Sequence, residues 1–199
     1  MAAFGSRHPL VEGLRDLRSQ VALHWMKKEP SRNSLALISA RRGEGKSFVA
    51  ANLAVLFSQM GRRTLLVDAD LIHPTQHHLF NINNRLGLSS VLGGLTGLEV
   101  AQPIPRLGAL TLLTAGPMPP NPRELLSRPR LASLLALAGK SYEVVLVDTP
   151  SAALTDAQII TRHVGATVLV SRLNVATVGE VAALTASLDN LLGAVVNQF

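Results

Sequence analysis

The segment from Ala40 to Ser47 has the composition of a loop that binds nucleotide phosphates. Gly43 and Gly45 allow a tight turn that directs backbone N–H groups at a polyphosphate, and a helix that begins near Lys46 adds the positive end of its dipole. Lys46 can reach the β and γ phosphates, and the Ser47 hydroxyl stands where such loops hold Mg²⁺. The pattern predicts binding of ATP and Mg²⁺. The alternative is a glycine-containing turn between a strand and a helix that binds no ligand.

Two apolar runs downstream end in carboxylates. Leu65 to Val67 leads into Asp68 and Asp70, and Val144 to Val147 leads into Asp148. Ligands of open parallel sheets bind at the carboxyl ends of the strands, so these acids should converge on the phosphate loop. We expect Asp148 to be the Walker B acid that holds the metal. The alternative for Asp68 and Asp70 is an ordinary turn at the end of a strand.

The order of the expected elements indicates the fold class. Strands alternate with helices along the chain, which predicts an α/β fold: a P-loop NTPase three-layer sandwich with a mostly parallel central sheet covered by helices on both faces. The expected strands are Leu35 to Ile38, the run before Asp68, Leu110 to Leu113, Glu143 to Val147, Thr167 to Val170 and Gly193 to Val196. The expected helices are Phe48 to Met60, Ala157 to His163 and Val178 to Leu191.

Apolar residues at helical spacing predict an amphipathic helix from Pro9 to Lys28, followed by a linker. We therefore divide the chain into an N-terminal helix and linker, residues 1–30, which could serve as an oligomerisation arm, and a nucleotide-binding domain, residues 31–199. Glu12, Arg15 and Arg18 share one face of this helix. That face could be a solvated, salt-bridged surface, or it could insert its charges into an adjacent subunit.

The sequences GEGKS, LLVDAD and VVLVDTP, in this order, resemble the bacterial tyrosine kinases (BY-kinases) that accompany chain-length determinants in capsule and exopolysaccharide assembly. Glu12, Arg15 and Arg18 match the EX2RX2R oligomerisation motif of that family. The Pro-rich segment from Gly116 to Leu126 and the segment from Pro74 to His77 match it as well. The resemblance covers essentially the whole chain.

The resemblance implies an ATP-dependent protein-tyrosine kinase that acts in, or regulates, polysaccharide chain-length control and export. It implies these catalytic residues: Lys46, Asp68 and Asp70. The implied Mg²⁺ ligands are Ser47, Asp68 and Asp148. The implied ATP-binding residues are Arg42, Gly43, Glu44, Gly45, Lys46, Ser47, Phe48 and Asn197, the last because related nucleotide-binding folds place an asparagine there against adenine. The implied partners are further copies of the chain and a membrane-embedded chain-length-determinant adaptor, which would recruit a cytoplasmic kinase to the inner face of the plasma membrane.

Two departures from the family keep other functions open. Ile72 stands where the second motif usually has an arginine, and Tyr142 is the only tyrosine, so no tyrosine cluster is present. One alternative is an ATPase switch like the septum-site and plasmid-partition proteins (MinD/ParA-like), although Arg41 stands where that group carries a signature lysine. Another is a nucleotide-binding scaffold of the polysaccharide assembly machinery without kinase activity.

Composition excludes several classes of site. The chain has no cysteine, which excludes disulfides and cysteine-held iron–sulfur clusters. The net charge of +6 favours anionic partners, but with 4% aromatic residues the chain lacks the stacking surface of a single-strand nucleic-acid groove, and we expect no nucleic acid. No apolar stretch is long enough to span a bilayer.

Three histidines, His73, His77 and His78, follow the second motif. His77 and His78 should diverge on a helix, so we do not expect the three to bind a metal.

Overall fold

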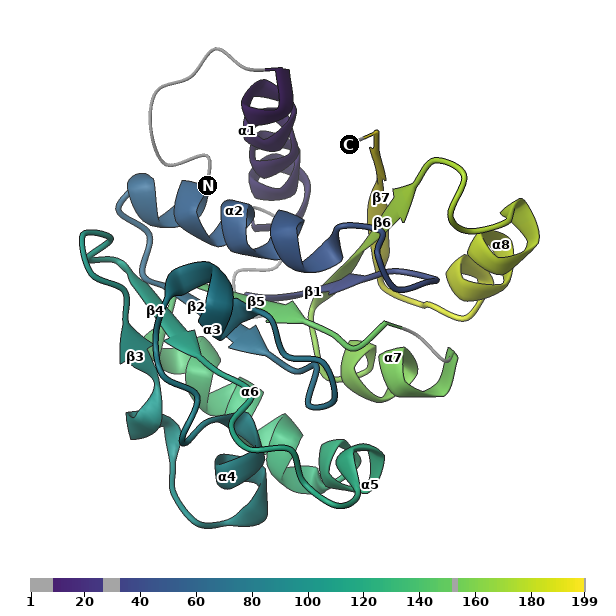
Figure 1. The fold of residues 1–199 in the computed structure, drawn as a ribbon. Coiled ribbons are helices and arrows are strands. Elements are labelled where there is room, and N and C mark those ends of the chain that lie inside the picture. Colours follow the sequence, from purple (N-terminus) through teal and green to yellow (C-terminus); the bar gives the residue numbers. More distant parts are fainter. Residues whose placement is uncertain (1–8, 27–32, 152–153, 199) are drawn as a thin grey trace.

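A single mixed sheet organises the described part of the chain, which in this computed structural model comprises residues 9–26, 33–151 and 154–198. The strand order is β3-β4-β2-β5-β1-β6-β7, and all neighbours are parallel except β3 and β4 (Figure 1). The strands are β1 Ser34–Ile38, β2 Thr64–Asp68, β3 Gln102–Pro103, β4 Leu110–Leu113, β5 Val144–Asp148, β6 Ala166–Arg172 and β7 Leu191–Asn197. The predicted α/β class with a mostly parallel sheet is confirmed.

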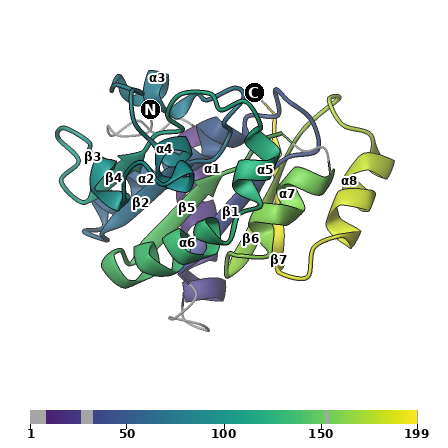
Figure 2. The same cartoon turned by 90° about the horizontal axis from the view of Figure 1, so that it is seen from below.

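Helices cover both faces of this sheet, as Figures 1 and 2 show from two directions. Helices α1 and α2 lie on one face, and α4 to α8 lie on the other. The helices are α1 Pro9–Val21 with a π-helical turn Ala22–Met26, α2 Lys46–Gln59, α3 Gln76–Phe80, α4 Leu88–Gly93, a 3-10 turn Leu98–Val100, α5 Pro122–Leu126, α6 Pro129–Ser141, α7 Leu154–Thr161 and α8 Val178–Ala186.

The alternation of side chains along β1 shows how the two apolar cores form. Leu35 and Leu37 pack against the α1 and α2 side, whereas Ala36 packs on the side of α4 to α6. Because successive residues of a strand point to opposite faces, a strand buried on both faces must be apolar throughout. This explains why the central strands read as continuous apolar runs.

Helix α2 is buried on nearly all sides, from Val49 to Ser58, because α1 covers the surface that faces away from the sheet. Leu14, Val21 and Trp25 of α1 and its π-helical turn belong to the same apolar core as α2. The predicted helix from Pro9 to Lys28 is confirmed as far as Met26, and its last two residues lie outside the described ranges, as do residues 1–8 and 29–32. The division at residue 30 remains a prediction.

Near the edges of the sheet one element prediction fails and one strand was not predicted. The helix predicted from Val178 to Leu191 ends at Ala186, because Leu191 already belongs to β7, which pairs with β6. The short strand β3 was not anticipated, since a pair of residues that includes Pro103 carries no periodic signal. Among the described residues, no helix has the length and apolar character needed to cross a membrane.

Candidate functional site

The phosphate loop connects β1 to α2, and two glycines shape it. Gly43 and Gly45 both have φ of 88°, a left-handed conformation that strains any residue with a Cβ atom. Gly45 is also the residue that caps the N-terminus of α2, so Lys46 and Ser47 form the first helical turn. A Cβ atom at Gly45 would collide with the side-chain amide of Asn197, whereas one at Gly43 would meet open space. The loop therefore has the conformation that a phosphate cradle requires.

Glu44 anchors the loop to the neighbouring strand. Its side chain is 1% exposed and accepts hydrogen bonds from the Arg41 backbone N–H at 2.6 Å, the Ser171 hydroxyl at 3.2 Å and the Arg172 backbone N–H at 3.3 Å. Asn197, at the end of β7, donates its side-chain Nδ2 to the Glu44 carbonyl at 3.0 Å. The Glu44 carboxylate thus holds the loop in place from within, and the fold brings Asn197 to the loop from the far end of the chain.

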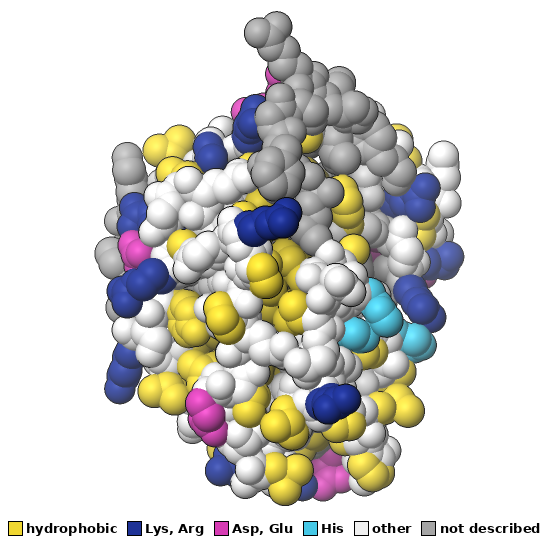
Figure 3. Space-filling view, turned by 60° about the vertical axis from the view of Figure 1, so that its left-hand side comes forward, with side chains coloured by type: hydrophobic (Ala, Val, Ile, Leu, Met, Phe, Trp, Pro, Cys, Tyr) yellow, Lys and Arg dark blue, Asp and Glu magenta, His cyan; other side chains and the backbone are white. Residues whose placement is uncertain are grey.

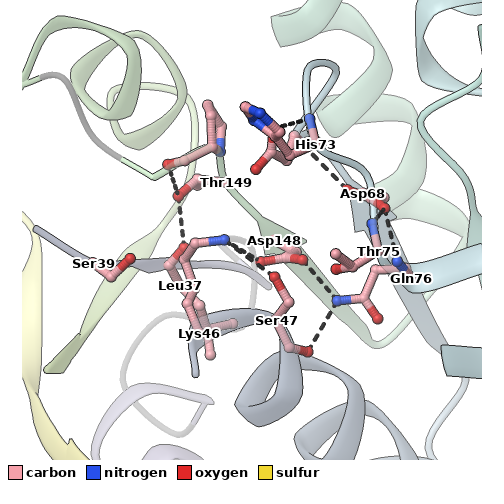
Figure 4. Close-up of polar contacts among 12 residues, drawn as sticks. Leu37, Ser39, Lys46, Ser47, Asp68, His73, Thr75, Gln76, Asp148 and Thr149 are labelled. Atoms are coloured by element: carbon pink, nitrogen blue, oxygen red, sulfur yellow. Dashed lines mark hydrogen bonds and ion pairs between the residues drawn. The ribbon is translucent and has the colours of Figure 1, made fainter. Parts of the chain in front are cut away.

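Lys46 forms a buried ion pair with Asp148. The distance from Lys46 Nζ to Asp148 Oδ1 is 2.6 Å, and the two side chains are 5% and 0% exposed (Figure 4). Lys46 Nζ also lies 3.5 Å from the Ser47 hydroxyl. Lys46, which is predicted to contact phosphates, is therefore held by Asp148, the predicted metal-binding acid. Removing either partner would leave an uncompensated charge in the interior.

Asp68 and Asp148 are register partners on the adjacent parallel strands β2 and β5. Both carboxylates are fully buried. Burial, together with the negative charge of Asp148, raises the pKa of Asp68 to about 7, although the Gln76 backbone N–H and the positive charge of Lys46 act in the opposite direction. Lys46 partly offsets this repulsion through its ion pair with Asp148.

The segment after β2 wraps around the two acids of the second motif. Asp68 accepts backbone hydrogen bonds from Asp70 at 3.2 Å, Thr75 at 3.1 Å and Gln76 at 3.0 Å. Asp70 accepts a backbone hydrogen bond from His73 at 2.9 Å. These bonds make residues 68 to 76 a compact turn that leads into α3, so the two acids also organise their own loop.

A pocket of about 250 Å³ opens above the phosphate loop. The residues that line it are Ser39, Arg42, Gly43, Glu44, Gly45, Lys46, Ser47, Phe48, Asp70, His73, Thr75 and Ser151. Of the predicted catalytic, metal-binding and ATP-binding residues, Asp68, Asp148 and Asn197 do not line it. Asp68 and Asp148 carry no exposed surface and lie directly behind Lys46 and Asp70. The structure thus gathers the predicted acids and the loop at one edge of the sheet, with Asp70 nearer to the pocket than Asp68.

The donor atoms at this edge fit a magnesium site. Ser47 contributes a hydroxyl, and Asp68 and Asp148 contribute carboxylates, which are the hard oxygen ligands that Mg²⁺ prefers. Lys46 donates to one carboxylate oxygen of Asp148, and this oxygen would become free to bind a metal if Lys46 contacted phosphates instead. The residues present are therefore compatible with Mg²⁺ bound together with a nucleotide.

Sequence reasoning missed three residues of the site. Gln76 is fully buried and donates to Asp148 at 2.7 Å and to the Ser47 carbonyl at 3.0 Å. Thr149 donates its hydroxyl to the Leu37 carbonyl at 2.8 Å, which ties the end of β5 to β1. His73 lines the pocket. Pro74 to His77 was recognised as a family segment, but nothing in the sequence alone showed that its glutamine turns inward.

The predicted oligomerisation residues lie on α1, away from the phosphate loop. Glu12 and Arg15 are exposed, and Arg18 is half-buried and donates to the Ser19 hydroxyl at 3.4 Å. Figure 3 shows that basic side chains on one face of the molecule are scattered and do not form a single patch. The charge on this face therefore does not by itself point to a partner.

Histidine side chains gather on the face shown in Figure 3, and two histidines after the second motif are in ring contact. The ring centroids of His77 and His78, on the short helix α3, lie 3.9 Å apart, so the expectation that these side chains diverge is wrong. Burial and the neighbouring His78 lower the pKa of His77. Among the described residues, no three His, Cys, Asp or Glu side chains are grouped so that they could hold a metal ion by themselves.

A larger cavity of about 700 Å³ lies at the other end of the strands, between α6, α7 and the turn before β7. Its lining includes Lys140, Arg162 and Asp189. The residues of the three motifs do not contribute to that lining, so the smaller pocket over the phosphate loop is the better candidate for catalysis.

Comparison with known proteins identifies relatives of this chain. A family model described as ParA, the NUBPL iron-transfer P-loop NTPase, matches residues 31–103. The tyrosine-protein kinase YwqD of Bacillus subtilis is 42% identical over 82% of this chain and 71% of its own length. The tyrosine-protein kinase Etk of Escherichia coli K12 is 38% identical over 94% of this chain, which spans 26% of Etk. This chain thus spans about a quarter of the longer curated relatives that it matches.

Solved structures agree with these relatives. The chimerical protein CapA2B2 matches with a TM-score of 0.87 at 34% identity, covering 97% of this chain and 86% of that one. The kinase domain of Escherichia coli ETK matches with a TM-score of 0.86 at 38% identity, covering 94% of this chain and 74% of that one. The Pyrococcus furiosus cell division ATPase MinD, at 22% identity and a TM-score of 0.70 over 84% of this chain and 73% of its own, shares the fold. The chain therefore belongs to the bacterial tyrosine kinases, a family built on the P-loop NTPase fold.

Proposed function

We propose that this chain is the catalytic domain of an ATP-dependent protein-tyrosine kinase that acts in capsule or exopolysaccharide assembly. The observation that carries the proposal is the convergence of Lys46, Ser47, Asp68 and Asp148 at the carboxyl ends of adjacent parallel strands. The named relatives are tyrosine-protein kinases, and one of them lies in a cps region. Together these support a kinase over other P-loop proteins.

In the proposed reaction ATP binds over the loop from Arg42 to Phe48, with backbone N–H groups directed at its phosphates and Asn197 near the base. Lys46 leaves Asp148 and contacts the terminal phosphates, where it stabilises the charge that develops during transfer. Ser47, Asp68 and Asp148 would hold Mg²⁺, directly or through water. Mg²⁺, when bound, supplies charge neutralisation on the phosphates.

The proposed reaction transfers the γ-phosphoryl group of ATP to a tyrosine. The phenolic oxygen of an acceptor tyrosine forms a bond to the γ phosphorus, the bond from this phosphorus to the β,γ-bridging oxygen breaks, and ADP leaves with that electron pair. Asp68 orients the hydroxyl and accepts its proton, while Asp70 supports Lys46 or the metal. Because Asp70 lines the pocket and Asp68 lies behind it, Asp70 is the alternative base. Positioning and charge neutralisation provide most of the acceleration.

The proposed partners follow from the family. We expect the chain to assemble with copies of itself through the face of Glu12, Arg15 and Arg18, and to be recruited to the inner face of the plasma membrane by a membrane-embedded chain-length-determinant adaptor. The exposure of Glu12 and Arg15 supports a contact surface on α1.

The test follows the γ-phosphate of radiolabelled ATP in the presence of Mg²⁺, with wild type and Lys46→Ala, alone and with native membranes that supply an adaptor. Label in phosphotyrosine that is lost in the variant would establish a kinase. Full activity in Lys46→Ala would contradict the site assignment.

A second function, an ATPase switch, is favoured by one observation. Ile72, where the family's second motif has an arginine, is 46% exposed and adds no charge to the pocket. A second motif without this arginine could support release of phosphate to water, or its retention, in place of transfer to a tyrosine. Phosphate released in a Lys46-dependent manner, with no labelled protein, would support the switch, and bound but unreacted ATP would support a scaffold.

A further inference from the structure

We propose that Gln76 is a positioning residue of this site, which holds the Asp148 carboxylate and the first turn of α2 in the arrangement that Mg²⁺ and nucleotide require. The inference rests on the proposed function, because it assigns a residue to the same Mg²⁺–nucleotide site.

Gln76 contacts all three motifs. Its side-chain Nε2 donates to Asp148 Oδ2 at 2.7 Å and to the Ser47 carbonyl at 3.0 Å, and its backbone N–H donates to Asp68 Oδ2 at 3.0 Å (Figure 4). Asp148 lies 72 positions away in the sequence and Ser47 lies 29 positions away. A single fully buried side chain therefore joins the phosphate loop to the Walker B strand, and its backbone joins both to the second motif.

The surroundings determine the orientation of the amide. Both contacts of Nε2 are to acceptors, a carboxylate and a carbonyl, so rotation of the amide by half a turn would bring its oxygen against two other oxygens. Both N–H groups of the Gln76 side-chain amide are thus used as donors. Its Oε1 is buried and finds no hydrogen-bond partner among the described residues. Burying a polar atom in this way opposes folding, so packing alone does not explain a glutamine here.

The two oxygens of Asp148 have different partners. Oδ1 pairs with Lys46 and Oδ2 accepts from Gln76. When Lys46 moves to the phosphates, Gln76 keeps its hydrogen bond and continues to orient the carboxylate, whose freed oxygen is then directed at the loop. Hydrogen bonds from outside the ligand set orient metal-binding carboxylates in this way, and their loss typically lowers metal affinity or activity about 10-fold to 100-fold.

The experiment measures the affinity for ADP by calorimetry, with Mg²⁺ and with EDTA, in wild type and Gln76→Met. Methionine is similar in size but donates no hydrogen bond. We expect ADP affinity in EDTA to stay within about twofold of wild type, and the enhancement of affinity by Mg²⁺ to fall about tenfold or more. In kinase assays kcat should fall, whereas KM for the acceptor should not change.

Phe80→Leu is the matched control for a loosened helix. Phe80 is also buried on α3, but it packs in the apolar core and does not contact the acids. The Phe80→Leu substitution should lower the melting temperature, but Mg²⁺ should still enhance the affinity for ADP as it does in wild type. If Phe80→Leu reproduced the loss seen in Gln76→Met, or if Gln76→Met kept the wild-type enhancement, the positioning role would be refuted.

Gln76→Glu provides a second variant if methionine prevents folding. It keeps the length of the side chain and the backbone bond to Asp68, but replaces the donor with an oxygen that repels Asp148. It should lose the Mg²⁺ enhancement at least as strongly, and an unchanged enhancement would contradict the role. Wild-type protein that does not bind ADP more tightly with Mg²⁺ would instead overturn the proposed function together with this inference.

Discussion

Lys46 and Asp148 lie 102 positions apart in the sequence, yet their charged atoms approach within 2.6 Å in the interior of the protein. The pair links the phosphate loop to β5, so the side chain of Lys46 lines the pocket while its charged end is held by Asp148. Each charge is stable in the interior because the other is present.

Removing Lys46 should therefore affect stability as well as catalysis. Lys46→Met should nearly abolish phosphoryl transfer, and should lower the free energy of unfolding by about 3–5 kcal/mol because Asp148 is left as an unpaired buried charge. Chemical denaturation without nucleotide checks the second effect. Lys46→Met combined with Asp148→Asn should recover part of the loss. Lys140→Ala, on the exposed surface of α6, is the matched control, and a comparable loss there would contradict the explanation.

The raised pKa of Asp68 predicts how stability depends on pH. Asp68 has a pKa of about 7 in the folded protein and 3.8 as its ordinary value, so the folded state binds this proton more tightly than the unfolded state. The stabilisation from this group is complete below the ordinary value and is lost as pH rises through about 7. The free energy of unfolding of Asp68→Asn, minus that of wild type, should therefore increase as pH rises from about 5 to 8, measured in EDTA without nucleotide. A difference that does not change with pH would contradict the prediction.

The two loop glycines should differ in their tolerance of alanine. Gly43→Ala should lower the free energy of unfolding by about 1–2 kcal/mol, because alanine is strained in the left-handed conformation of this residue. Gly45→Ala should cost more and weaken nucleotide binding more, because its Cβ also collides with Asn197. Thermal melts compare the stability of the two variants, and ADP titrations compare their affinity for nucleotide. Adding Asn197→Ala to Gly45→Ala should restore part of the stability, and no restoration would show that the collision is unimportant.

His73 and Ile72 should contribute differently to ATP binding, although they are adjacent. His73 lines the pocket, whereas Ile72 does not and is 46% exposed. His73→Ala should raise KM for ATP severalfold, and Ile72→Ala should leave it unchanged. Steady-state kinetics with varied ATP provide the measurement, and equal effects of the two substitutions would contradict a contact between ATP and His73 in this pocket.

The exposed face of α1 should govern self-association. Glu12→Ala with Arg15→Ala should reduce the oligomeric state, measured by light scattering after size exclusion, and should change stability by no more than about 0.5 kcal/mol because both side chains are exposed. Arg162→Ala, also exposed but on the opposite side of the sheet, serves as control. A change in oligomeric state in the control, or none in the double variant, would remove α1 from the interface.

Local pattern predicted the central part of the fold well. The runs that became β1, β2 and β5 are apolar throughout because both faces of each strand are covered, and GEGKS identified the turn into α2. Prediction was weaker at the edges of the sheet. Leu191 was assigned to a helix but pairs with β6, and β3 escaped notice because its pairing with β4 depends on a distant partner.

The sequence by itself determined the family, the mostly parallel α/β sheet and the identity of the phosphate loop and its acids, because those features depend on residue types at short spacing. Only the tertiary structure decided which side chains meet. It turned Glu44 inward, placed Asn197 against the loop, buried Asp68 behind Asp70, and joined Gln76 to Asp148. These contacts join segments that lie far apart in the chain. Their geometry depends on the register of the sheet and on the helices that cover it. No short window of sequence contains that information.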